Sequence, residues 1–230
     1  MPEKKNTAAS SRQSNDPIVR VWDLPTRLFH WLLVFCVAVS VVTGRIGGLY
    51  MRYHEWSGVT ILVLILFRIV WGVVGGRHAR FAAFVAGPKA VVGYARDLFG
   101  EAHRRYLGHN PLGGWSILAM LVALGVQAGT GLFANDDIFT EGPLAHWISK
   151  GSSDLLTRIH LFNKGVLLML VGVHLLAVVF YYLVKRENLL VPMITGYKRW
   201  PQAVEDTDNG VIKAAVILIV LALCAYLVIY

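Results

Sequence analysis

Long apolar runs separated by short polar segments make up most of the chain. Five of these runs are long enough to cross a bilayer, since about 20 mainly apolar residues in a helix span a hydrocarbon layer of roughly 30 Å. They cover residues 28–50, 56–76, 113–133, 161–184 and 211–230. A backbone in lipid must satisfy its own hydrogen bonds, and the alternating pattern typical of barrel strands is not seen. The pattern predicts an all-α fold, an integral membrane bundle of helices.

The composition indicates the same class of protein. Of the 230 residues, 56% are hydrophobic and only 16% are charged, and the mean hydropathy is +0.55. A single soluble domain of this size could not bury so much apolar surface. We therefore expect membrane lipid around the five helices.

Lysine and arginine are concentrated in alternate loops. They lie before the first span, between the second and third, and after the fourth, as Lys4, Lys5, Arg12, Arg20, Arg27, Arg77, Arg80, Lys89, Arg96, Arg104, Arg105, Lys185, Arg186, Lys198 and Arg199. The opposite loops hold only Arg45, Arg52, Lys150 and Arg158, together with Asp136, Asp137, Glu141 and Asp154. By the positive-inside rule, the N-terminus is cytoplasmic and, after five spans, the C-terminus lies outside.

The net charge of +8 could instead indicate nucleic-acid binding. However, the charge is spread over loops on one membrane face, where it suits anionic lipid. We expect no nucleic-acid partner.

Four segments are expected along the chain. Residues 1–20 resemble a disordered cytoplasmic tail, residues 21–186 contain four spans, residues 187–210 form a polar cytoplasmic linker, and residues 211–230 add a further transmembrane helix. Within the loop between the second and third spans, residues 89–99 are predicted to form an interfacial helix. Cys36 and Cys224 fall within spans and no Cys-x-x-Cys-His motif exists, so covalently attached haem is not expected.

Two histidines in the fourth span suggest a cofactor. His160 and His174 are fourteen residues apart, which in a helix is about 21 Å and 40° short of four turns, so they share one face at different depths. Ionisable groups in lipid usually face the bundle interior and have partners. Haem iron is such a partner, because a neutral imidazole is a standard axial ligand.

The other spans offer one histidine at each depth. The fourth span enters from outside, which makes His160 the outer of its pair; His54 starts the second span on that side, and His30 lies in the first turns of the first span. We therefore predict two couples, His54 with His160 and His30 with His174. His30 looks shallower than His174, and an earlier helix start near Pro25 would reduce the difference.

Two further residues follow the same spacing. Arg68 lies fourteen after His54, where it could pair with a haem propionate or simply extend toward the cytoplasm. Gly44 lies fourteen after His30, where it could admit a porphyrin or allow close helix packing. The remaining histidines, His78, His103, His109 and His146, are interpreted as surface residues.

Several motifs resemble a known family. They are "VWDLPTRLFHW" (21–31), "RYHEWSGVTILVLILFRIVWG" (52–72), "YLGHNPLGG" (106–114), the His160/His174 pair and "MITGYKRW" (193–200). Over residues 20–200 the chain resembles the bacterial cytochrome b561 and Ni-Fe hydrogenase b-type cytochrome subunits.

The resemblance implies a four-helix di-haem core in the bacterial inner (cytoplasmic) membrane, with the C-terminus in the periplasm. It implies two bis-histidine haems b held by the residues that match the family's ligands, His30, His54, His160 and His174. It also implies exchange of electrons with ubiquinone or menaquinone and with a partner redox protein. The fifth, C-terminal transmembrane helix departs from the family's four-helix pattern.

Three functions remain open. The first is a respiratory subunit that passes electrons between quinone and a partner redox protein or complex, which includes the role of b-type cytochrome anchor in a hydrogenase-like enzyme. The second is a stand-alone superoxide:quinone oxidoreductase, for which Arg52, Arg158 and Lys164 could guide the anion, although these residues could equally pair with propionates or sit at the interface. The third is a membrane anchor without haem. No catalytic residue is predicted, and whether the chain is itself an enzyme stays open.

Overall fold

The computed structural model describes residues 16–98, 105–202, 204 and 210–229. Five of its helices are long and apolar enough to cross a membrane. The elements in chain order are β1 (Ile18–Arg20), α2 (Leu24–Ile46), η1 (Gly48–Tyr50), α3 (Met51–Val74), η2 (Arg77–Ala79), α4 (Phe81–Phe84), α5 (Pro88–Asp97), α6 (Pro111–Gly131), η3 (Ala145–Trp147), α7 (Lys150–Leu183), α8 (Leu190–Thr195), β2 (Tyr197–Arg199) and α9 (Val211–Ile229). The expected all-α membrane bundle is confirmed.

Local sequence sets where the spanning helices begin. Asp23 caps α2 by accepting a hydrogen bond from the Thr26 amide, with proline in the first turn. The helix therefore starts at Leu24 and not at residue 28, which agrees with the early start suggested by Pro25. Asn110 and Ser149 cap α6 and α7 in the same way.

The helix α7 is much longer than its apolar run. It has 34 residues and begins at Lys150, eleven residues before the predicted start. Its first turns are polar, so hydropathy alone did not reveal them. As a result, His160 lies about 15 Å inside the helix and not at its end.

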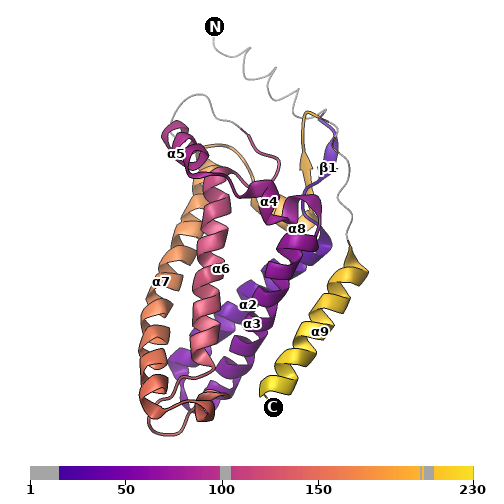
Figure 1. The fold of residues 1–230 in the computed structure, drawn as a ribbon. Coiled ribbons are helices and arrows are strands. Elements are labelled where there is room, and N and C mark those ends of the chain that lie inside the picture. The colour runs from indigo at the N-terminus through magenta and orange to yellow at the C-terminus, as the bar shows by residue number, and fades with distance from the viewer. Residues whose placement is uncertain (1–15, 99–104, 203, 205–209, 230) are drawn as a thin grey trace.

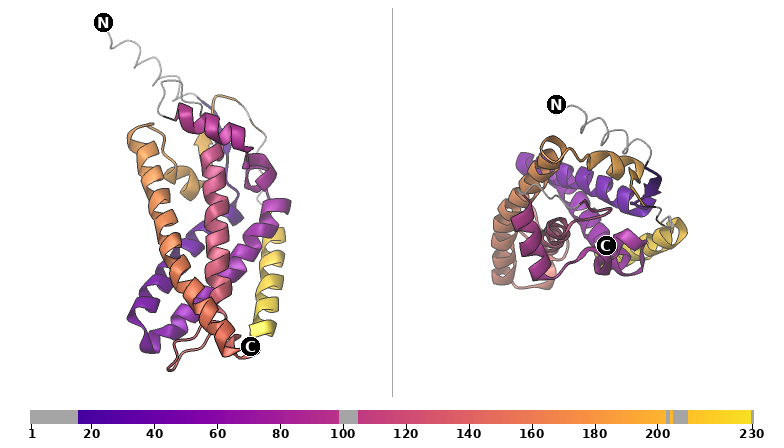
Figure 2. Two further views of the ribbon diagram at one scale, coloured as in Figure 1. Left: turned by 60° about the vertical axis from the view of Figure 1, so that its left-hand side comes forward. Right: turned by 90° about the horizontal axis from the view of Figure 1, so that it is seen from above.

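The bundle is built from a few main helix pairs. The helix α2 packs along α3, α6 along α7, and α3 contacts both α6 and α9 (Figures 1 and 2). The fifth span, α9, lies beside α3, and Lys213 near its start donates a hydrogen bond to the carbonyl of Val74 at the end of α3, 3.0 Å away. The helix α9 thus packs on α3 outside the four-helix core.

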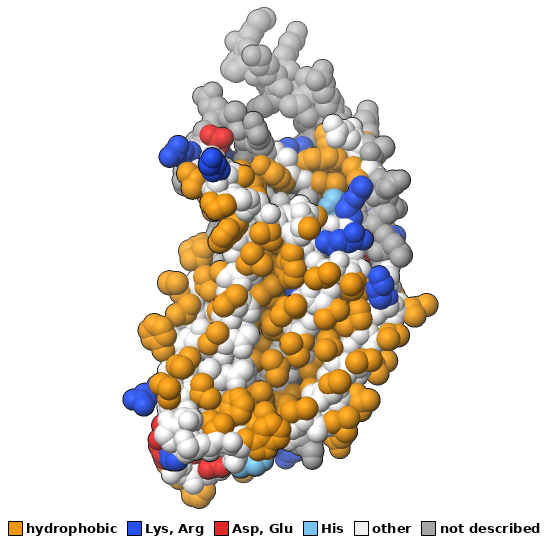
Figure 3. Space-filling model, in the orientation of Figure 1, with side chains coloured by type: hydrophobic (Ala, Val, Ile, Leu, Met, Phe, Trp, Pro, Cys, Tyr) orange, Lys and Arg blue, Asp and Glu red, His pale blue; other side chains and the backbone are white. Residues whose placement is uncertain are grey.

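Charged side chains gather at the two ends of the bundle. Figure 3 shows an orange apolar band in the middle of the molecule, with lysine and arginine above it and acidic, basic and histidine side chains below it. Apolar side chains that face outward over the length of the helices are stable only in lipid. This distribution fits a membrane-spanning bundle.

The end near the N-terminus carries an added layer. The strand β1 pairs antiparallel with β2, with Val19 opposite Lys198, and α4, α5 and α8 lie at the same end (Figure 1). The interfacial helix expected at residues 89–99 is present as α5, although Phe99 lies outside the described residues. Residues 18–20, expected within the tail, and residues 197–199, expected within the linker, form these two strands because each segment provides the other's hydrogen-bonding partner.

Candidate haem-binding site

His54 of α3 and His160 of α7 lie together inside the bundle. Their ring centroids are 6.1 Å apart and the ring planes meet at 79°. Both side chains are half-buried. The structure thus brings together the residues predicted as the outer couple.

Backbone carbonyls fix the orientation of both rings. Nδ1 of His54 lies 2.8 Å from the carbonyl oxygen of Ser40, and Nδ1 of His160 lies 2.9 Å from that of Gln127. A carbonyl can only accept, so each Nδ1 carries the proton and donates it. The lone pair of each neutral ring is then on Nε2, which is the usual arrangement for a metal-binding histidine with its second ring nitrogen anchored.

Two glycines make room for these rings. A Cβ added at Gly44 of α2 would lie 2.8 Å from Nδ1 of His54, and one at Gly131 of α6 would lie 3.0 Å from Cε1 of His160. Both distances are shorter than ordinary van der Waals contact. The prediction placed Gly44 at the outer site but gave a different reason; in the structure it makes room for an imidazole.

Sequence reasoning missed the polar residues of α6. The side-chain nitrogen of Gln127 lies 3.0 Å from Nε2 of His160, and its oxygen accepts a hydrogen bond from Asn163 at 2.8 Å. Since Asn163 occupies the oxygen, the Gln127 amide donates to the His160 lone pair. A polar side chain within an apolar span was the signal that could have revealed Gln127.

His30 of α2 and His174 of α7 lie near the opposite end of the bundle. Each is half-buried, and they are close enough for their charges to interact. Nδ1 of His30 is buried and has no hydrogen-bond partner among the described residues. The inner couple is therefore brought together less tightly than the outer one.

Arg68 is buried close to this inner couple. It is only 3% exposed, and its guanidinium lies over the rings of Phe81 and Phe84. It is also near enough to His109 for their charges to interact. Arg68 therefore does not extend to the surface of the bundle.

His109 was wrongly interpreted as a surface residue. Its ring packs between Trp22 and Phe84, with centroid distances of 4.5 and 4.7 Å, and its charge would interact with that of His174. Of the other histidines, His146 is exposed as predicted, His78 is half-buried, and His103 lies outside the described residues.

The three basic residues that could guide an anion have different surroundings in the structure. The Arg52 guanidinium lies over the rings of Trp56 and Tyr53, 4.6 and 5.6 Å from their centroids. Arg158 and Lys164 are exposed on α7, and the charge of Lys164 acts on His160. Arg52 is thus engaged at an aromatic surface.

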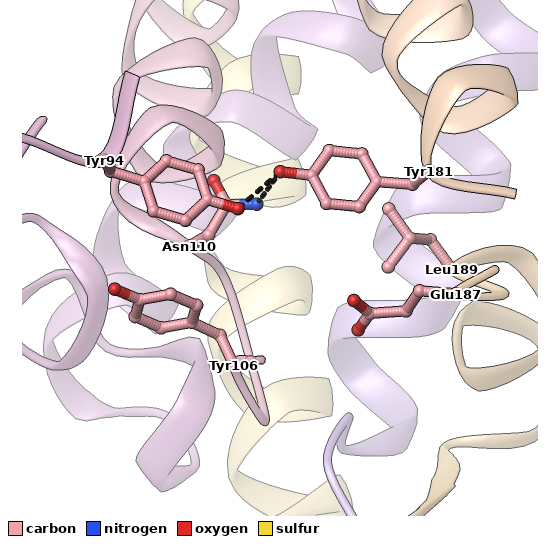
Figure 4. A pocket seen from close by; sticks show the side chains of 7 residues that line it. Tyr94, Tyr106, Asn110, Tyr181, Glu187 and Leu189 are labelled. Atoms are coloured by element: carbon pink, nitrogen blue, oxygen red, sulfur yellow. Dashed lines mark hydrogen bonds between the residues drawn. The ribbon is translucent and has the colours of Figure 1, made fainter. Parts of the chain in front are cut away.

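A small polar cavity lies at the inner end of the bundle (Figure 4). The hydroxyl groups of Tyr94 and Tyr181 are 2.6 Å apart, and Asn110 donates to Tyr181 at 2.9 Å. Burial, together with the bond to Tyr181, raises the pKa of Tyr94, so the hydroxyl stays protonated. The cavity of about 20 Å³ is also lined by Glu187, and that volume holds one water molecule.

The comparisons with known proteins agree with this geometry. The family model of prokaryotic cytochrome b561 matches residues 21–196. The chain belongs to this family. It is therefore a multi-pass membrane cytochrome b, a protein of electron transport that binds b-type haem.

The most similar relatives include named subunits of hydrogenases. A probable Ni/Fe-hydrogenase B-type cytochrome subunit of Bradyrhizobium diazoefficiens is 25% identical over 227 residues, covering 84% of this chain and 91% of the relative. That of Rhizobium leguminosarum bv. viciae is 28% identical over 225 residues, covering 82% and 90%. The probable Ni/Fe-hydrogenase 1 B-type cytochrome subunit of Escherichia coli (strain K12) is 35% identical over 88 residues, covering 30% and 37%. No solved structure matches the chain.

The residues of this cytochrome b fit a haem at the outer couple. Two imidazoles that bind one metal at nitrogen–metal distances of roughly 2 Å have ring centroids about 6 Å apart, which is close to the observed 6.1 Å. In addition, neither α2 nor α3 is among the main packing partners of α7. The helices that carry paired histidines are therefore not packed closely against one another.

The inner couple also fits a haem, and a different observation supports this. Nδ1 of His30 and Nη1 of Arg68 are buried atoms without a hydrogen-bond partner in the described part of the chain. Buried polar atoms are rarely left unpaired in proteins. A bound group that has both a metal and carboxylates would satisfy this region.

Proposed function

We propose that this chain is the di-haem cytochrome b subunit of a respiratory complex and carries electrons across the bacterial inner membrane between quinone and a partner redox enzyme. The main support is that one helix, α7, meets a histidine of α3 through His160 and a histidine of α2 through His174. The relatives support the partner class, because those above are named as cytochrome subunits of Ni/Fe hydrogenases.

Each histidine couple would hold one haem b. His54 and His160 would bind the outer iron, and His30 and His174 the inner iron. A haem bound in this way takes up and releases one electron at its iron. The hydrogen bonds from Nδ1 to Ser40 and Gln127 hold the outer imidazoles in place and make their Nε2 atoms better ligands.

The ligand set favours electron transfer over chemistry at the metal. With two imidazoles per iron, neither metal keeps an open position for oxygen or another substrate. The two histidines of α7 are about 21 Å apart along the helix, so two centres at different depths can serve both membrane surfaces.

Two other residues would complete these sites. Arg68 would pair with a propionate of the inner haem, because its buried charge needs an anion. Gly44 would leave space beside His54 and would let the outer porphyrin approach α2.

The charge distribution supports one orientation. The basic N-terminal end of the bundle would face the cytoplasm and the acidic loops near Asp136 the periplasm. The inner couple would then lie beneath the cytoplasmic surface. Quinone, which is ubiquinone or menaquinone, would reach the chain from the lipid, and the partner enzyme would bind an exposed end.

A haem count tests the core of this proposal. Pyridine haemochrome analysis of the purified chain should give two haems b per polypeptide. A count of one or zero contradicts the di-haem assignment, and zero would favour an anchor without haem.

Hydrogen-dependent reduction tests the partner class. In native membranes, addition of hydrogen should reduce the b-type haem, which is followed by its absorption band. A short-chain quinone should then reoxidise the haem. The His30→Ala variant, expressed at the same level, should lose this coupling. If hydrogen does not reduce the b-type haem in membranes with an active hydrogenase, the proposed partner is wrong.

A further inference from the structure

Arg68 has a buried positive charge whose Nη1 atom has no hydrogen bond. The residue is 3% exposed, and no partner for Nη1 exists among the described residues. Its guanidinium lies 5.0 and 5.9 Å from the ring centroids of Phe81 and Phe84. Ring faces offset part of the charge, but a buried charge is stable only when it is paired and hydrogen-bonded. The Nη1 atom therefore needs a hydrogen-bond acceptor.

Asp23 does not meet this need. It is near enough for its charge to act on Arg68, yet both of its oxygens are bound elsewhere. Oδ1 accepts from the amide of Thr26 at 2.7 Å, and Oδ2 accepts from Nε1 of Trp71 at 3.2 Å. Asp23 thus offsets the charge of Arg68 without satisfying its N–H groups.

His109 offers a second donor at the same place. Its Nδ1 is buried and, within the described residues, has no partner. Phe84 links the two groups, because its ring is 4.7 Å from that of His109 and also contacts Arg68. Burial, followed by the positive charge of Arg68, lowers the pKa of His109 to about 3. The ring is therefore neutral near pH 7 and has one N–H to donate.

His78 adds to the same set. Its Nε2 is another buried atom without a partner in the described chain, and it lies near Gly108, whose added Cβ would be 3.6 Å from Nδ1 of His78. Arg68, His78 and His109 thus each have a buried nitrogen atom without a partner in the described chain, and they lie around one region near His174.

We propose that Arg68 and His109 together bind a propionate carboxylate of the inner haem, so that His109 is a cofactor-positioning residue. A carboxylate accepts a stronger hydrogen bond from the guanidinium than a neutral quinone carbonyl does. The proximity of His109 to His174 connects the pair to the inner couple. The inference rests on the inner haem of the proposed function.

A redox titration of the purified full-length chain tests the role of His109. In His109→Phe the carboxylate loses a hydrogen-bond donor. More of its negative charge is then uncompensated, and this charge stabilises ferric iron. We expect a lower midpoint potential for the inner haem and an unchanged potential for the outer haem. The two are assigned by the electron paramagnetic resonance signal that disappears in His30→Ala. His109→Gln keeps an N–H donor, so the midpoint potential of its inner haem should be close to that of the unmodified protein.

Infrared difference spectra give a readout that a merely structural role would not change. With haem labelled with ¹³C at the propionate carboxylates, the carboxylate band should shift in His109→Phe and in Arg68→Lys. The matched control is His146→Phe, which replaces an exposed histidine at the other end of the chain and should change neither the band nor the potentials. If His109→Phe does not hold two haems, the comparison passes to His109→Leu, whose apolar side chain also has no N–H donor and should lower the potential.

The outcomes separate this inference from the proposed function. If the unmodified chain holds fewer than two haems, the proposed function itself fails. If it holds two, and His109→Phe leaves both the inner potential and the carboxylate band unchanged, only the role of His109 is overturned. Slower quinone reduction with both signals unchanged would also overturn it, because a quinone carbonyl would then be the bound group.

Discussion

The rings of His54 and His160 lie 6.1 Å apart, and each ring donates its Nδ1 proton to a backbone carbonyl of a neighbouring helix. The two acceptors come from α2 and α6, so four helices cooperate to orient two ligand atoms. In the proposed di-haem arrangement, removing either imidazole would leave only one axial ligand for the outer haem. We predict that His54→Ala and His160→Ala each lower the haem content from two to one per chain, measured by pyridine haemochrome. Two haems in either variant would show that this couple does not hold one.

Gly44 should not tolerate even a methyl group. A Cβ there would lie 2.8 Å from Nδ1 of His54, so Gly44→Ala must move the imidazole or the helix. Overpacking of this kind typically costs about 1–3 kcal/mol, and we expect faster loss of the outer haem on dilution. Gly58→Ala is the matched control, because nothing lies within 4 Å of its added Cβ. Equal haem retention in the two variants would contradict the steric argument.

Gln127 should be dispensable for haem binding. Its amide donates to Nε2 of His160, and one lone pair cannot bind an amide and an iron together. We predict that Gln127→Leu keeps two haems per chain and incorporates the outer haem at least as fast as the unmodified protein. A loss of haem, measured in a reconstitution time course, would indicate that Gln127 takes a direct part in the site.

Tyr181 should contribute measurably to stability. Its hydroxyl accepts from Asn110 and contacts the hydroxyl of Tyr94, so Tyr181→Phe leaves buried polar groups without a partner, at a cost of about 1–3 kcal/mol. We expect a lower thermal unfolding midpoint. Tyr182→Phe, one position along and 57% exposed, should leave the midpoint unchanged.

Asp136 should hold the loop between α6 and α7 in shape. Its carboxylate accepts from the amides of Ile138, Phe139 and Thr140; these bonds, that of Thr140 foremost, lower the pKa of Asp136. Since the folded pKa is lower than the unfolded one, this stabilisation is present above about pH 4 and is lost as the pH falls further. Asp136→Ala should speed hydrogen exchange at the three amides near pH 7, whereas Asp136→Asn keeps the accepting oxygen and should retain part of the protection. Unchanged exchange in the alanine variant would exclude this role.

The spans could be predicted because the lipid layer sets the length and the apolar character of a helix that crosses it. A helix that crosses it must be about 20 apolar residues long, and the five predicted runs correspond to five helices. The start of α7 was missed, since its first eleven residues are mostly polar and lie outside any apolar run. The pairing of β1 with β2 was also missed, because their partners are far apart in sequence and neither segment is long enough to show a strand pattern.

The two histidine couples show what helix geometry can predict. The spacing of His160 and His174 placed them on one face, and counting from the ends of the spans matched each with the histidine that lies near it in the structure. The same reasoning failed for His109, since a loop has no fixed period and its burial between Trp22 and Phe84 depends on three separate elements.

The sequence by itself therefore determined the membrane class, the number of spans and the face that carries the histidines, because these follow from local hydropathy and from the helical repeat. The tertiary structure alone decided which carbonyls orient the imidazoles, why Gly44 and Gly131 have no side chain, and that Arg68 and His109 share one buried region. These features depend on how separate helices and loops approach one another, and side-chain packing over long sequence distances sets that approach.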